Sequence, residues 1–206
     1  MIKIWGRNTS VNVQKVMWAV GELKLAHERI DVGGAFGKNR EPAYLAMNPN
    51  GLVPTLEEDD FILWESNTIV RYLAAKYGAG TLEPSDLRSR ARAQSWMDWQ
   101  LAVAAPAIHG LFWGLVRTPP EKRDPAALET ARQRAAEYWK MVESQLARGD
   151  YLAGDALTLA DICVGIWGYR WHAYPIERPS LPRLKAWCER LAHSRGFKAH
   201  VDAPIK

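Results

Sequence analysis

Apolar and polar positions follow two different periods in the N-terminal part of the chain. Ile2-Lys3-Ile4-Trp5 and the stretch from His27 to Val32 alternate every second residue, which is typical of short strands. Between them, apolar residues recur every three or four positions from Val13 to Leu23, which predicts a helix. Gly21 inside this helix indicates either a weak point or close packing.

The next stretch is organised around a turn and a proline. Asn48-Pro49-Asn50-Gly51 is dense in turn residues, and a short helix is expected just before it, over residues 41–46. Leu52-Val53-Pro54-Thr55-Leu56 is a short apolar run, in which the proline indicates an edge strand or a special bend. A second strand is expected at Phe61 to Trp64. A helix then follows, with Ser66 as its N-cap, and ends near Gly78.

This order of elements, β-α-β-α and then β-β-α, is that of a thioredoxin-like domain over residues 1–78. Residues 79–86 contain Gly80 and Pro84 without apolar periodicity and are interpreted as a linker. Residues 87–206 have only helical periodicity. The predicted fold class is therefore an α/β thioredoxin-like N-terminal domain followed by an all-α C-terminal domain.

Four helices are expected in the C-terminal domain. A long one runs from Leu87 to about Arg117, and Asp124-Pro125 opens the next, which is expected to end at Gly149. Thr158-Leu159-Ala160-Asp161 has the spacing of a capping box and opens the third. Ser180 is expected to cap the fourth.

Composition excludes several classes of protein. Hydrophobic residues make up 48% and charged residues 24%, as in soluble globular proteins, and the net charge of +4 is modest. Lysine and arginine are scattered, which argues against nucleic-acid binding. No apolar run looks long enough to cross a membrane, no signal peptide is recognisable, and the two cysteines lie far apart. These features favour the cytoplasm, without a metal site.

The sequence resembles the glutathione transferases. Val53-Pro54, followed about a dozen residues later by Glu65-Ser66 and an apolar helix, is similar to the glutathione-binding half of that family. An edge proline and a serine cap are each common, but both in this order are fairly specific. An α/β domain joined to a helical domain extends the resemblance over the whole chain. Thr158 and Asp161 match the family's helix cap, a folding motif.

The resemblance implies a site for glutathione as co-substrate, with no prosthetic group. It implies a cis bond before Pro54, which leaves the backbone of Val53 free to pair with the extended tripeptide. Glu65 and Ser66 would hold the γ-glutamyl end, since free N–H groups at a helix start favour a carboxylate. The glycyl carboxylate would lie near Asn39 and Arg40, with Lys38 beside them; surface solvation is the alternative for these residues.

A hydroxyl donor is expected between the first strand and the first helix. Ser10-Val11-Asn12 matches the Ser-x-Asn pattern of serine-type members, so Ser10 is the candidate donor to the glutathione sulfur, with Asn12 nearby. Thr9 and Asn8 are the alternatives, because a shift of one residue in the turn would point another side chain at the sulfur. Ser10 could instead be only an N-cap. Tyrosine-type and cysteine-type members need a tyrosine or cysteine here, and neither is present.

The helical domain supplies the remaining candidates. His109, Trp113 and Arg117 fall where the family faces its second substrate, although a tryptophan at helical spacing is more often core. The family forms two-fold dimers, in which an acidic residue of the long helix reaches the partner's glutathione. Asp98 is that candidate, and pairing with Arg92 or solvent is the alternative.

The predicted function is a cytosolic, bacterial-like glutathione transferase of detoxification type. It would be a homodimer that uses glutathione to attack a small electrophile, without nucleic-acid or membrane partners. Two alternatives remain open from sequence. One is a transferase-like protein that only binds ligands or assembles. The other is a glutathione-dependent peroxidase or reductase.

Overall fold

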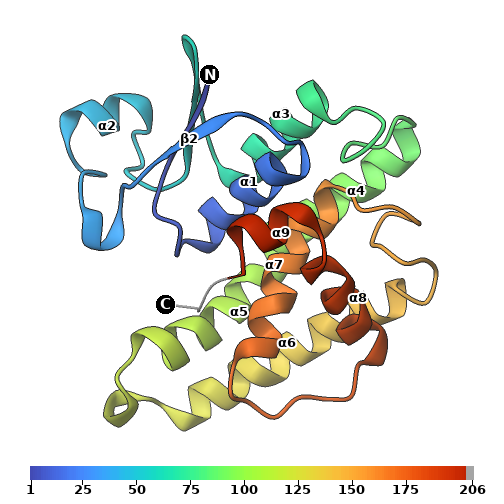
Figure 1. Cartoon of the computed structure of the whole chain (residues 1–206). Helices are drawn as coiled ribbons and strands as arrows, with labels where there is room; N and C mark the ends of the chain where they lie inside the picture. The colour runs from blue at the N-terminus through green and yellow to red at the C-terminus, as the bar shows by residue number, and fades with distance from the viewer. Residues whose placement is uncertain (203–206) are drawn as a thin grey trace. The chain divides into compact units, whose positions relative to one another are not determined.

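The computed structural model describes residues 1–202, which fall into two compact units (Figure 1). Met1–Glu83 form the first unit together with residues 193–202, and Pro84–Ala192 form the second. The division after Glu83 falls inside the predicted linker 79–86. The predicted helical domain 87–206 was wrong for residues 193–202, because these residues pack on the first unit; its last four residues, 203–206, lie outside the described residues.

The first unit contains a mixed four-stranded sheet with the order β2-β1-β3-β4. Its strands are β1 (Ile2–Trp5), β2 (His27–Ile30), β3 (Thr55–Glu58) and β4 (Phe61–Trp64). β1 is parallel to β2 and antiparallel to β3, which is antiparallel to β4. The helical elements are α1 (Val11–Glu22), η1 (Gly34–Phe36), α2 (Pro42–Met47), α3 (Ser66–Tyr77) and α9 (Arg195–His200). The predicted thioredoxin-like order is confirmed.

The short helix α9 was not predicted, and it explains Gly21. α9 packs against α1, where a Cβ on Gly21 would lie 2.6 Å from the Cα of Gly196. Trp18 Nε1 donates to Ser194 Oγ at 3.0 Å, and the N–H of Gly196 donates to Glu22 Oε1 at 2.8 Å. Gly21 therefore marks close packing, the second of the two readings that the sequence allowed.

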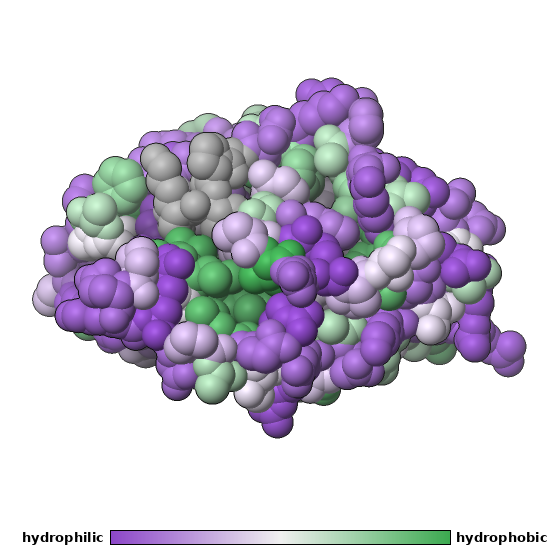
Figure 2. All heavy atoms as spheres, turned by 90° about the horizontal axis from the view of Figure 1, so that it is seen from below, coloured by the Kyte–Doolittle hydropathy of each residue, from purple (hydrophilic) through white to green (hydrophobic). Residues whose placement is uncertain are grey.

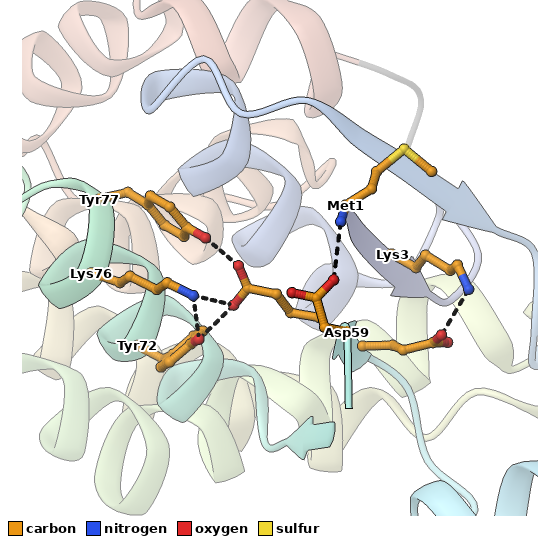
Figure 3. Close-up of polar contacts among 8 residues, drawn as sticks. Met1, Lys3, Asp59, Tyr72, Lys76 and Tyr77 are labelled. Atoms are coloured by element: carbon orange, nitrogen blue, oxygen red, sulfur yellow. Dashed lines mark hydrogen bonds and ion pairs between the residues drawn. The ribbon is translucent and has the colours of Figure 1, made fainter. Parts of the chain in front are cut away.

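A carboxylate network ties the end of the sheet to α3 (Figure 3). Glu58, 7% exposed, accepts hydrogen bonds from the hydroxyls of Tyr72, at 2.5 Å, and Tyr77, and Lys76 Nζ lies 2.9 Å from its Oε2. On β1, Lys3 Nζ pairs with Glu57 Oε1 at 2.7 Å. The Glu58 contacts tie β3 to α3, and the Lys3–Glu57 pair ties β1 to β3.

The second unit is helical throughout its regular structure. Its elements are α4 (Leu87–Trp99), η2 (Gln100–Ala104), α5 (Ala105–Phe112), η3 (Trp113–Arg117), η4 (Pro120–Lys122), α6 (Pro125–Gln145), α7 (Leu159–Ala173) and α8 (Pro182–Ala192). α4 to η3 form one helical run, as predicted for Leu87 to Arg117, in which η2 and η3 are π-helical segments. Asp124 caps α6 as predicted, through bonds from the N–H groups of Ala126 and Ala127.

Two predicted helix ends were wrong. α6 ends at Gln145 with Leu146 as its C-cap, so Gly149 lies beyond the helix end. α8 begins at Pro182, which suits the first helical position, so Ser180 lies too early to be its N-cap. The predicted cap of α7 is confirmed: the N–H of Thr158 donates to the carboxylate of Asp161 at 2.9 Å, and this aspartate is fully buried.

The expectation that no apolar run is long enough to cross a membrane needs correction. Within the described chain, the run Leu87–Arg117 is long and apolar enough to cross a membrane by composition, with a mean hydropathy of 1.3 over its best window. Core helices of soluble proteins meet the same criterion, but only 28% of that window is buried within this chain. Apolar side chains also gather near the middle of the face shown in Figure 2, with hydrophilic ones at either side.

Candidate functional site

Two helix N-termini meet at one cavity in the first unit. Asn12 from the first turn of α1 lines it together with Glu65 and Ser66 at the start of α3. The first N–H groups of a helix have no acceptor within the helix, and the helix dipole makes this end positive. A cavity between the N-termini of α1 and α3 therefore favours a ligand with two negatively charged groups, one near each helix start.

Glu65, rather than Ser66, occupies the N-cap position of α3. Its backbone has φ 72° and ψ 111°, and its side chain makes no capping bond; Ser66 is the first helical residue. The prediction of Ser66 as the N-cap was therefore wrong by one residue. A non-glycine residue in this region costs about 1–3 kcal/mol, and such conformations cluster at ligand sites. The conformation of Glu65 turns the chain so that Ser66, 6% exposed, lies at the cavity wall.

The loop before β3 forms the opposite wall. Asn48, Asn50, Leu52, Val53 and Pro54 line the cavity, and the bond between Val53 and Pro54 is cis, as expected. In the described part of the chain, the backbone N–H and C=O of Val53 have no hydrogen-bond partner. They are available to an extended ligand.

Two buried side chains that sequence analysis missed hold this loop. Asn48 Nδ2 donates to the Leu52 carbonyl at 2.9 Å, and the Tyr44 hydroxyl donates to the same oxygen at 2.7 Å. Burial raises the pKa of Tyr44, so its hydroxyl remains a donor. The sequence showed the turn but not that Asn48 is 2% exposed and pairs across it.

A buried lysine joins the two helix starts. Lys15 on α1 is 1% exposed, and its Nζ donates to Asn67 Oδ1 on α3 at 2.7 Å. Asn67 directly follows Ser66, so this bond fixes the start of α3 relative to α1. The local sequence pattern carries no signal for this pair, because the burial of α1 from Val13 to Gly21 is visible only in the structure.

The candidate hydroxyls occupy the turn that leads into α1. Ser10 is the N-cap residue and 8% exposed, and its side chain makes no capping bond; Thr9 is half-buried and Asn8 is exposed. Gly6 permits the close approach of this turn to the loop, because a Cβ there would lie 3.2 Å from Cβ of Val53. Ser10 thus precedes Asn12 of the cavity wall by two residues, with its hydroxyl not used for capping.

Asn39 and Arg40 bind the neighbouring turn. Asn39 Nδ2 donates to the Gly51 carbonyl at 2.8 Å, and Arg40 Nη1 donates to the Asn50 carbonyl at 3.3 Å. Neither lines the cavity, although Asn50 does. These bonds support the cavity wall, and a direct contact of either side chain with a ligand stays a prediction.

The other candidates lie in the second unit. Asp98 is exposed in the last turn of α4. The His109 ring lies 5.2 Å from that of Trp167, and the Arg117 guanidinium lies 5.3 Å from the Phe112 ring. Trp113 is 60% exposed, so the alternative of a core tryptophan is wrong. Among residues 1–202, no group of three or more His, Cys, Asp or Glu residues could hold a metal ion.

The sequence and the fold were compared with known proteins. Residues 5–84 match the family model "Glutathione S-transferase, N-terminal domain", and residues 125–190 match "Glutathione S-transferase, C-terminal domain". Glutathione S-transferase GstB of Escherichia coli K12 is 40% identical, and the alignment covers all of both chains. Glutathione S-transferase 3 of Zea mays is 32% identical over 98% of this chain and 94% of its own.

A solved structure is also similar over the whole chain. It is the theta class glutathione S-transferase of the citrus canker pathogen Xanthomonas axonopodis pv. citri with glutathione bound. The TM-score is 0.96 at 44% identity, and the match covers 100% of this chain and 99% of the other.

Proposed function

Because the chain belongs to the glutathione S-transferase family and is a glutathione transferase, we propose that it holds glutathione in the cavity between α1 and α3 and activates its thiol with Ser10. The observation that carries this proposal is the convergence of Asn12, Val53, Glu65 and Ser66 on one cavity at two helix N-termini. Such ends attract anions, and glutathione brings carboxylates and a thiol that must ionise.

In the proposed pose, the γ-glutamyl carboxylate lies at the start of α3. The N–H and hydroxyl of Ser66 donate to it, and Glu65 receives the ammonium group of the same residue. The backbone of Val53 pairs with the main chain of the tripeptide as a short added strand. Asn39 and Arg40 act on the glycyl end through the turn that they support.

The thiol lies at the start of α1 in this pose. A cysteine-like thiol has a pKa of about 8.5, so only a few per cent is thiolate at pH 7. Lowering the pKa by about two units needs about 2.7 kcal/mol of preference for the anion. One charge-assisted hydrogen bond from Ser10, with the N–H groups and dipole of α1, can supply this. Thr9 and Asn12 are secondary donors in the same turn.

The reaction follows from the ionised thiol. The sulfur lone pair forms a bond to the electrophilic carbon of the second substrate, and the electron pair leaves with a leaving group or moves to an adjacent electron-withdrawing group. The thiol proton has already passed to solvent. Catalysis consists of thiolate stabilisation and of holding both reactants together. His109, Trp113 and Arg117 are proposed to contact the second substrate. Their aromatic rings suit its apolar part, and the Arg117 cation suits an electron-rich substituent on it.

We further propose a cytoplasmic homodimer with a role in detoxification. The largely unburied apolar run Leu87–Arg117 and the exposed Phe61 and Trp64 of β4 supply surface that a second copy would cover. Asp98 would then reach the glutathione ammonium of the partner. Both cysteines are free thiols, as in a reducing compartment.

Calorimetry with glutathione, followed by turnover of a panel of electrophiles, tests the proposed site. Ser66→Ala should weaken glutathione binding about tenfold, the scale of one lost charge-assisted bond, with little effect on turnover at saturation. Thr68→Ala, which removes an exposed hydroxyl from the same helical turn, is the matched control and should change neither value. Equal affinity of the wild type and Ser66→Ala would remove the start of α3 from the proposed site.

A further inference from the structure

Two histidines meet where α9 lies on the first unit. His200 is the last residue of α9, and His27 is the first residue of β2. The centroids of their rings are 5.4 Å apart, and the rings meet edge to face at 73°. Both side chains are half-buried, and the proposed thiol chemistry uses neither of them.

The His200 ring lies in a tightly packed interface between α9 and α1. A Cβ on Gly21 of α1 would lie 2.9 Å from Cδ2 of His200. The Trp18 and Phe197 rings also meet edge to face in this interface, with their centroids 5.0 Å apart. The next residue after His200, Val201, is fully buried. The ring therefore has little room to turn away from His27 while α9 stays in place.

β2 presents basic groups to His200. His27 and Arg29 both disfavour its cationic form. The Arg29 guanidinium pairs with Asp31 and donates to the Gly6 carbonyl at 2.8 Å, which holds it beside the two histidines. Over residues 1–202, no carboxylate pairs with either histidine. A proton on each ring would thus add two positive charges next to a third.

The charged groups of α1 and α9 do not compensate these charges. Glu22 of α1 accepts from the N–H of Gly196 at 2.8 Å, at the opposite end of α9 from His200. Lys15 of α1 faces α3, where it bonds Asn67. The other charged residues of β2, α9 and their ends are exposed, namely Lys24, Glu28, Arg195, Lys198 and Asp202.

The protonation of His200 is coupled to the position of α9. Burial, with His27 and Arg29 nearby, lowers the pKa of His200 in the folded protein. A released α9 would let the ring titrate near its ordinary value of about 6.5. The contribution of a neutral His200 to docking is therefore complete above that pH and is lost as the pH falls below it. His27 Nδ1 lies 2.9 Å from the Leu25 carbonyl and donates to it, so Nε2 takes up the second proton of that ring.

We propose that α9 is a pH-sensitive latch, docked on α1 and β2 at neutral pH and released when His27 and His200 both become cations. Two like charges at this separation repel, and partial burial strengthens the repulsion. Release uncovers the face of α1 that carries Trp18 and Gly21, and the first turn of α1 holds Asn12 at the proposed glutathione cavity. Mild acid would thus loosen the helix that supports the site, through a contact outside the cavity.

Hydrogen exchange of the amides of residues 195–202 tests the latch on the intact protein. Protection factors are measured at pH 7.5 and pH 5.5 and corrected for the intrinsic exchange rate at each pH. In the wild type, protection should fall about tenfold at pH 5.5, the scale of repulsion between two unit charges near a protein surface. His200→Phe and His27→Phe each keep a ring in the contact and remove one charge, so protection should be equal at both pH values. His193→Asn removes an exposed histidine of the same segment and should respond as the wild type does.

Two results for the wild type would overturn the proposal: equal protection at both pH values, or no protection at pH 7.5. A pH response that persists in both phenylalanine variants would do the same. If a phenylalanine does not fit the contact, His200→Gln and His27→Gln supply neutral side chains for the same comparison. Ser66→Ala should leave the response of α9 unchanged, so failure of the latch and failure of the proposed glutathione site are distinguishable.

Discussion

Glu58→Gln is predicted to destabilise the first unit in a pH-dependent way. Glu58 is the last residue of β3. Its carboxylate accepts bonds from three residues of α3, namely Tyr72, Lys76 and Tyr77 (Figure 3). Burial opposes its charge, but these three hydrogen bonds outweigh burial and lower the pKa to about 2. Glutamine keeps the shape of the side chain and removes the charge that the donors stabilise.

The size of the effect follows from the pKa. An unperturbed glutamate titrates near 4.3, so a folded-state value of about 2 corresponds to at most about 3 kcal/mol. Because Lys76 is 44% exposed, solvent screens its share, and about 2 kcal/mol is the expected value at pH 7. A depressed pKa means that this stabilisation is complete above pH ~4.3 and is lost as the pH falls from there towards about 2.

Urea unfolding of the wild type and Glu58→Gln between pH 7 and pH 3 measures this effect. The difference in free energy of unfolding should fall by about half over that range, since titration of Glu58 is only partial at pH 3. Asp60→Asn, which removes an exposed carboxylate two residues away, is the control and should change the stability by less than about 0.5 kcal/mol. A difference between the wild type and Glu58→Gln that does not depend on pH would refute the reasoning.

Three further predictions concern packing, assembly and the shared site. Gly196→Ala places a Cβ 2.2 Å from the carbonyl oxygen of Trp18 and should cost about 1–3 kcal/mol, seen as a lower thermal midpoint; an unchanged midpoint would show that α9 shifts freely. Sedimentation at low micromolar concentration should show a species of twice the 23.3 kDa chain mass, and a single species at the chain mass would exclude the dimer. Asp98→Asn should raise the glutathione dissociation constant without splitting that dimer, whereas an unchanged constant would leave Asp98 as a surface acid.

The sequence predicted those parts of the molecule that depend on local pattern. The strands and long helices follow from period-two and period-3.6 hydropathy, and Asp124-Pro125 and Thr158-x-x-Asp161 cap helices as expected. Five candidate residues line one cavity: Asn12, Glu65 and Ser66 lie at helix starts, and Val53 and Pro54 lie directly before β3.

Features that depend on contacts between distant segments could not be predicted in this way. α9 has six residues, too few for a periodic signal, and its place on α1 depends on the fit of Gly21 to Gly196. The bond of Lys15 to Asn67 joins residues 52 positions apart, and the pattern around each gives no sign of the other. The N-cap of α3 was missed because a glutamate gives no sign that its φ is positive. Glycine or asparagine is the usual residue in that conformation.

The ionisation of bound glutathione tests the central claim most directly. The thiolate can be followed by its ultraviolet absorbance while the pH is raised, with the wild type and Ser10→Ala both saturated with glutathione. The account predicts an apparent pKa about two units below the free value of about 8.5 in the wild type. In Ser10→Ala it should rise most of the way back, with turnover reduced ten- to a thousandfold, the scale of ~1.4–4 kcal/mol for one lost donor. An unshifted thiol in the wild type, or the same pKa in Ser10→Ala with the loss found in Thr9→Ala or Asn8→Ala instead, would contradict it.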